Sequence, residues 1–124
     1  MKYAIPLPAP VTLPIDGSDA VFPVLRVFCV GRNYAEHAVE MGHDPDREPA
    51  IWLRVNGELR QEGDLGQQIW KVPETIAYLS TPVELRPGDL IMTGTPSGVG
   101  RVVPGDRLEG HVDGLGDLTV EYIG

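Results

Sequence analysis

Glycine and proline interrupt this chain at short intervals along its whole length. The sequence holds 15 glycines and 12 prolines in 124 residues. In a helix interior a glycine costs about 1 kcal/mol and a proline about 3 kcal/mol relative to alanine. Long helical bundles and coiled coils are therefore excluded, and the sequence predicts one turn-rich, β-dominated domain.

The chain is acidic, with 18 Asp and Glu against 10 Lys and Arg, a net charge of -8 and a pI near 4.7. Such a surface repels the phosphates of nucleic acids and anionic membranes, so neither is an expected partner. No apolar run approaches the ~20 residues that span a bilayer. The proline-rich N-terminus lacks the apolar stretch of a secretory leader, and we expect a cytoplasmic protein.

Residues 1–20 place prolines between small and apolar residues, which predicts an extended arm that wraps on the domain or on a partner. Residues 21–124 are expected to form a single domain. Its first predicted strand runs from Val24 to Val30. This strand contains Cys29, the only cysteine, which excludes an internal disulfide and is expected to be a small buried hydrophobe.

A hairpin and a helix are predicted further along the domain. Asn56-Gly57 is the residue pair that a two-residue type I′ turn requires, and it joins predicted strands at residues 51–55 and 58–61. Apolar residues recur at helical spacing from Ile69 to Leu79, with Pro73 in the first turn. Later strands are expected at residues 90–93, 108–112 and 118–123.

The clearest candidates for chemistry follow the first strand. We expect Asn33 to cap a short helix from Tyr34 to Met41, on which His37 and Glu40 share a face. A carboxylate beside an imidazole raises its basicity, as a general base acting on water requires. A solvated pair on an exposed helix is the alternative. The junction between strand and helix, with Arg32 and Tyr34, is a typical place for a ligand site.

Two loops complete the candidate features. The glycine-rich stretch Thr93–Gly100 offers hydroxyls and backbone N–H groups that can cradle a carboxylate, or it is a tight connection between strands. Asp44, Asp46 and Glu48 alternate as in half of a calcium loop. The glycine and the final glutamate of such a loop are missing, so a solvated loop is expected.

Together these segments resemble the fumarylacetoacetate hydrolase family, and within it the fumarylpyruvate and acylpyruvate hydrolases. The resemblance covers nearly the whole chain. Its motifs are Val27–Tyr34 with His37, Glu40 and Gly42, then Ile51–Glu58 with Gln61, and finally Pro87–Gly100. It implies an α+β fold, a β-rich roll or barrel-like sandwich with two short helices, and a homodimer.

The resemblance also implies an activity, hydrolysis of a carbon–carbon bond in a small 1,3-diketo acid. His37 with Glu40 would activate water. Arg32, Tyr34, Thr93, Gly94 and Thr95 would bind the substrate. Decarboxylation or isomerisation of a related keto acid is an alternative within the family.

The chain departs from the family pattern between Ala50 and Ile51. Family members carry there a long segment with a Glu-x-Glu pair and an Asp that bind Mg²⁺ or Mn²⁺. This chain contains no Glu-x-Glu sequence, so no metal ligands are assigned. We therefore expect an impaired hydrolase or, as the alternative, a non-catalytic remnant that serves as an oligomerising or binding module.

Overall fold

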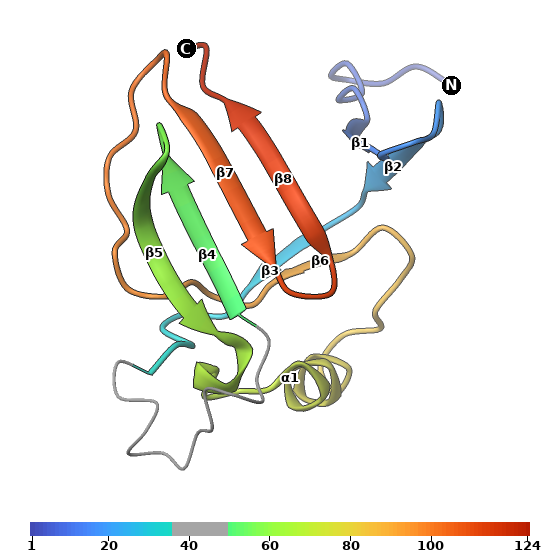
Figure 1. The fold of residues 1–124 in the computed structure, drawn as a ribbon. Coiled ribbons are helices and arrows are strands. Elements are labelled where there is room, and N and C mark those ends of the chain that lie inside the picture. Colours follow the sequence, from blue (N-terminus) through green and yellow to red (C-terminus); the bar gives the residue numbers. More distant parts are fainter. Residues whose placement is uncertain (36–49) are drawn as a thin grey trace.

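The structure, a computed structural model, describes residues 1–35 and 50–124. Within these residues strands predominate, arranged in one four-stranded sheet and two pairs of strands, with a single α-helix and a short 3-10 helix. Figure 1 shows the four-stranded sheet on one side of the molecule, α1 beyond one of its ends and the β1–β2 pair at a distance from it. The predicted β-rich α+β fold is confirmed.

The four-stranded sheet is antiparallel throughout, in the order β5-β4-β7-β8. Its strands are β4 (Ala50–Val55), β5 (Glu58–Asp64), β7 (Arg107–Val112) and β8 (Gly116–Glu121). Asn56 and Gly57 have φ angles of 52° and 81°, both in the left-handed region that a type I′ turn needs. The predicted hairpin is confirmed, and β5 extends three residues beyond its expected end at Gln61.

A parallel pair, β3 (Val27–Cys29) with β6 (Leu90–Met92), connects distant parts of the chain. It is fixed where both strands begin, because Arg26 Nη2 and Nε lie 2.6 and 2.9 Å from the two carboxylate oxygens of Asp89. This two-point ion pair holds the pKa of Asp89 below its usual range, chiefly through the hydrogen bond from Arg26.

The predicted strand from Val24 to Val30 is wrong as a single element. Its first residue ends β2 (Val21–Val24), which pairs with β1 (Val11–Pro14), and β3 begins only at Val27. The break occurs because the chain leaves β1 and joins the segment before β6, where the Leu25 N–H donates to the carbonyl of Gly88. Residues 1–20 thus include a strand whose partner lies beyond residue 20.

The predicted helix is α1 (Val72–Leu79), with Pro73 in its first turn. A 3-10 helix at Leu65–Gln67 precedes it. Ile69 lies before α1 rather than on it, and its N–H donates to the carbonyl of Asn33. In the described part of the chain no helix has the length and the apolar character needed to cross a bilayer.

Apolar burial is sparse. Among the apolar side chains of the described residues, only Val55 and Pro96 are buried. Cys29 is exposed, which contradicts its prediction as a buried hydrophobe. Parallel strands are normally covered by other elements on both faces of the sheet. Cys29 would be buried only if another element covered its face of the β3–β6 pair. In the described residues, the β3–β6 pair leaves Val27 and Met92 more than half exposed.

Candidate functional site

Asn33 holds three segments of the chain together just after β3. Its side chain is 1% exposed. Nδ2 donates to the carbonyls of Trp70 (3.0 Å) and Thr93 (2.8 Å), and Oδ1 accepts from the Trp70 N–H (2.7 Å). The predicted role of Asn33 as a helix cap is wrong, because its amide joins segments that are 37 and 60 residues apart.

The expected start of the helix is also extended. Tyr34 forms a β-bridge with Gln68, and the Ala35 N–H donates to the carbonyl of Gln67 at 2.9 Å. The rest of the predicted helix, with His37 and Glu40, lies outside the described residues, as does the Asp44–Glu48 loop.

The loop after β6 approaches both of its neighbours so closely that two glycines are required. Gly94 has a φ of 99°, and a Cβ there would lie 2.9 Å from the Asn33 Cβ. Gly98 has a φ of 101°, and a Cβ would lie 2.1 Å from the carbonyl oxygen of Arg60 on β5. The loop is therefore seated between the segment after β3 and strand β5.

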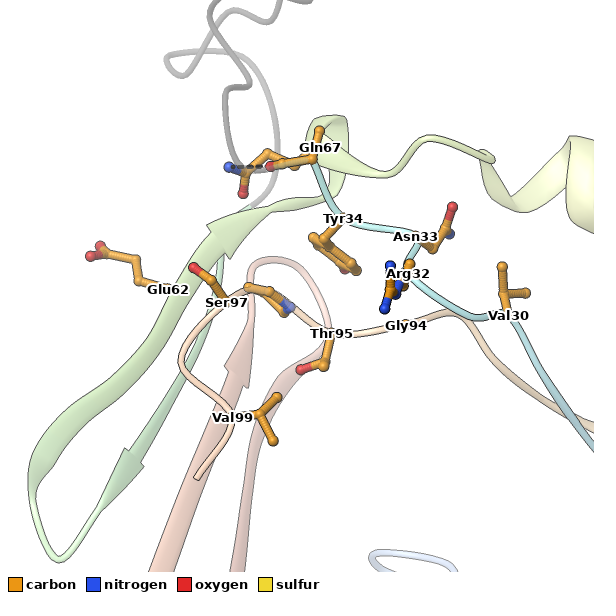
Figure 2. A pocket seen from close by; sticks show the side chains of 12 residues that line it. Val30, Arg32, Asn33, Tyr34, Glu62, Gln67, Gly94, Thr95, Ser97 and Val99 are labelled. Atoms are coloured by element: carbon orange, nitrogen blue, oxygen red, sulfur yellow. Dashed lines mark hydrogen bonds between the residues drawn. The ribbon is translucent and has the colours of Figure 1, made fainter. Parts of the chain in front are cut away.

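A pocket of 540 Å³ opens between these elements. Figure 2 shows Arg32, Asn33 and Tyr34 on one side and Thr95, Ser97 and Val99 of the loop on the other, with Glu62 of β5 at its edge. Four of the predicted substrate-binding residues line it, namely Arg32, Tyr34, Gly94 and Thr95. The fifth, Thr93, is not among the residues that line it.

Arg32 stands in an unusual backbone conformation at this pocket. Its φ of 49° falls in the left-handed region, which non-glycine residues rarely adopt. Such conformations cost free energy and occur often at binding sites, where the surrounding structure enforces them. Arg32 is also the only cationic side chain among the described residues that line the pocket.

Gln68 links Tyr34, which lines the pocket, to Thr93. Its Nε2 lies 3.3 Å from the Tyr34 hydroxyl and 3.3 Å from Thr93 Oγ1, and Gln68 itself is buried. Burial raises the pKa of Tyr34 above its usual value, so its hydroxyl keeps its proton at neutral pH. Because Gln68 donates to that oxygen, the tyrosine proton points elsewhere.

Gln61 of β5, which belongs to one of the family motifs, positions the loop. Its Nε2 donates to Thr95 Oγ1 at 2.8 Å and to the carbonyl of Pro96 at 2.7 Å. Since Thr95 Oγ1 accepts here, its own proton remains available as a donor. No local sequence pattern predicts this contact, because it depends on β5 lying beside a loop 34 residues away.

The comparisons with known proteins agree with this arrangement. Residues 43–121 match the family model described as "Fumarylacetoacetate (FAA) hydrolase C-terminal". The chain belongs to the fumarylacetoacetate hydrolase family.

Two curated relatives in this family illustrate its range. The chain is 51% identical over 71 residues to the fumarylpyruvate hydrolase of a Ralstonia species, a match covering 57% of this chain and 37% of that protein. It is 48% identical over 69 residues to the human mitochondrial oxaloacetate tautomerase FAHD1, covering 56% of this chain and 31% of that protein. The matches thus span about a third of these relatives.

A solved member of the family has the same fold. The fumarylpyruvate hydrolase from Pseudomonas aeruginosa, in complex with Mn²⁺ and pyruvate, superposes with a TM-score of 0.77 at 30% identity. The match covers 98% of this chain and 99% of that chain. The predicted resemblance to the family is confirmed.

The described residues do not fit a family metal. Residues 1–35 and 50–124 contain no group of three His, Cys, Asp or Glu side chains placed to hold an ion. In that part of the chain Glu62 is the only carboxylate that lines the pocket. Mg²⁺ and Mn²⁺ prefer several oxygen ligands, and a single carboxylate does not supply them.

Proposed function

We propose that this domain binds a small 1,3-diketo acid, of the acylpyruvate or fumarylpyruvate class, and hydrolyses its carbon–carbon bond slowly in the cytoplasm. The observation that carries the proposal is the convergence of Arg32, Tyr34 and Thr95 on one pocket. The family membership and the named activity of the Ralstonia relative support it.

The chemistry of this pocket suits the substrate carboxylate. Arg32 supplies the cation, with its guanidinium geometry matched to a carboxylate. Thr95 supplies a hydroxyl donor whose acceptor side is occupied by Gln61. Tyr34 supplies a second neutral hydroxyl. Together they hold the acid end of the ligand through charge-assisted hydrogen bonds.

The reaction consumes one water and gives pyruvate and a second carboxylic acid. His37, oriented by Glu40, takes a proton from water, and the hydroxide attacks the distal carbonyl carbon. The bond between that carbon and the neighbouring methylene then breaks, and its electron pair forms the enolate of pyruvate. A proton from the His37 imidazolium completes pyruvate. The placement of this pair relative to the pocket stays a prediction, because both residues lie outside the described part of the chain.

Slow turnover follows from the charge that develops on the enolate oxygen. In the described pocket the guanidinium of Arg32 is the only cation, and the other side-chain donors for this charge are neutral, chiefly the hydroxyls of Tyr34, Thr95 and Ser97. Preorganised electrostatic stabilisation is often the largest contribution to catalysis, and weakening it costs several kcal/mol.

A second candidate function is binding without turnover. It is favoured by the single carboxylate that the described residues bring to the pocket. In this case His37 and Glu40 are relics, and the domain acts as a binding or oligomerising module.

The assay is pyruvate release from acetylpyruvate or fumarylpyruvate, with calorimetric titration of the same ligands. Activity that is abolished by His37→Ala and nearly abolished by Glu40→Gln supports hydrolysis, and Asp46→Asn serves as the control. Binding without release supports the second function.

Ligand affinity should fall about tenfold or more in Arg32→Gln, as for a lost charge-assisted bond, but not in Arg86→Gln, which lies beyond the opposite end of β6. Equal affinity in both variants would contradict the proposed site.

A further inference from the structure

A second, apolar hollow of 620 Å³ lies beside the pocket, on one face of the four-stranded sheet. Its floor includes Leu53, Gly110 and Leu118, which the strand register places side by side on β4, β7 and β8. Gly110 has no side chain, so the sheet is hollowed at this point. Hollows of this size accept small organic groups.

The hollow and the pocket meet at the loop after β6. Thr95 and Pro96 line both of them, and Gln61, which holds these two residues, lines the apolar hollow as well. A ligand whose carboxylate is held near Thr95 therefore has an apolar surface directly next to it. This continuity identifies the far end of the same ligand as the occupant.

The charges around the hollow decide what that far end is. Its lining contains no Lys or Arg. The charged residues at its edge, His111 and Asp117, alternate with Gly110 and Leu118 along β7 and β8, so the pleat turns their side chains toward the opposite face of the sheet. His111 already lies against Asp117 through Nδ1 and against Asp113 through Nε2, at 2.8 Å in the latter case. A second carboxylate placed over Gly110 would therefore meet apolar side chains without a cation to pair with.

We propose that this hollow is an apolar subsite for the acyl group of the substrate, and that the domain prefers acylpyruvates with an alkyl or aryl acyl group over fumarylpyruvate. The inference rests on the proposed function, since it needs a keto acid in the neighbouring pocket. It goes further by assigning the substituent that distinguishes one diketo acid from another.

Gly110 offers a direct test, because a Cβ at this position would meet only ordinary contacts, 3.9 Å from the Leu118 carbonyl oxygen and 4.0 Å from a Leu53 methyl. Gly110→Val therefore fills the hollow without backbone strain, and valine is favoured in strands. Thr119→Val is the matched control, since Thr119 is paired with Glu109 and lies on the opposite face of the same sheet.

The experiment is calorimetric titration with acetylpyruvate, hexanoylpyruvate and fumarylpyruvate. Each buried methylene raises affinity about fourfold. Hexanoylpyruvate should therefore bind at least tenfold more tightly than acetylpyruvate, with fumarylpyruvate the weakest. Gly110→Val should remove the hexanoyl advantage, and Thr119→Val should retain it.

The outcomes separate the two proposals. Absence of binding by all three acids overturns the proposed function and this inference with it. If acetylpyruvate binds but hexanoylpyruvate binds no more tightly, or if fumarylpyruvate binds best, only the inference fails. It also fails if Gly110→Val leaves the hexanoyl preference intact and instead changes the sedimentation coefficient, because a second copy of the chain then covers this face.

Discussion

The side-chain amide of Gln61 donates to Thr95 Oγ1 at 2.8 Å and thereby fixes which way the threonine proton can point. The same amide holds the carbonyl of Pro96 at 2.7 Å. Gln61 of strand β5 thus positions Thr95, which lines the pocket, although Gln61 itself does not line it.

Replacing Gln61 with leucine should weaken keto-acid binding more than it weakens the fold. Leucine has a similar size but no donor, so Thr95 loses the partner that orients its hydroxyl. One hydrogen bond contributes about 1 kcal/mol, which corresponds to a roughly fivefold loss of affinity for pyruvate. Calorimetry measures it, with Glu58→Gln at the exposed start of β5 as the control. Unchanged affinity in Gln61→Leu would show that Thr95 does not donate to the ligand.

Asn33→Ala should destabilise the domain strongly. It removes three hydrogen bonds from a side chain that is 1% exposed and leaves two carbonyls and one N–H of the surrounding segments unpaired. Buried groups left without partners cost about 1–3 kcal/mol each. Urea unfolding should therefore show a loss of several kcal/mol. Thr12→Ala, at an exposed position of β1, is the control. If the two variants lose the same free energy of unfolding within error, water replaces the Asn33 amide.

Local signals allowed part of this fold to be predicted. Asn56-Gly57 specifies its turn because both residues tolerate positive φ angles, and Pro73 marks the start of α1 because proline suits a first turn. These features depend on neighbours in sequence. Four of the five predicted substrate-binding residues, Arg32, Tyr34, Gly94 and Thr95, line the pocket, because they belong to two contiguous motifs.

The missed features depend on partners far along the chain. Asn33 looked like a helix cap because its partners, Trp70 and Thr93, are invisible to a local pattern. Cys29 looked buried because its run is apolar, but burial depends on what covers a strand. The contact between His111 and Asp117 follows from the register of β7 and β8, which sequence did not supply.

His111 should make stability depend on pH near neutrality. It stacks on Trp52 with ring centroids 5.1 Å apart, and its hydrogen bonds with Asp117 and then Asp113 raise its pKa above the usual value. A raised pKa in the folded state means that the stabilisation is complete below the unfolded pKa of about 6.5 and is lost as pH rises through the folded value. Melting temperatures measured from below about pH 6.5 upward through the folded pKa of His111 should fall with rising pH for the native chain. They should change less for His111→Gln. Parallel profiles would contradict this linkage.

The domain should self-associate, as the family resemblance and the uncovered apolar surface both indicate. Val27, Met92 and Tyr78 are 54%, 57% and 71% exposed. Large exposed apolar patches mark surfaces that bind a partner, and a second copy of the chain is the partner we expect here. Sedimentation at micromolar concentration should show a dimer, and Tyr78→Glu should weaken it while Ser18→Glu does not. A monodisperse monomer would count against this expectation.

Divalent metals should contribute little to ligand binding. Within residues 1–35 and 50–124, Glu62 is the only carboxylate that lines the pocket, and no three potential ligands gather elsewhere in these residues. Loose oxygen ligands such as Asp44, Asp46 and Glu48 are expected to bind Mg²⁺ or Mn²⁺ no more tightly than about 1 mM. Calorimetric titration with each ion should therefore show no tighter site, and a chelator should leave pyruvate affinity unchanged.

A one-to-one site in the micromolar range that Glu62→Gln abolishes would place a metal in the pocket and overturn the argument for slow turnover. The same site abolished by Asp46→Asn, with Glu62→Gln silent, would place the ion on the acidic loop and leave that argument intact.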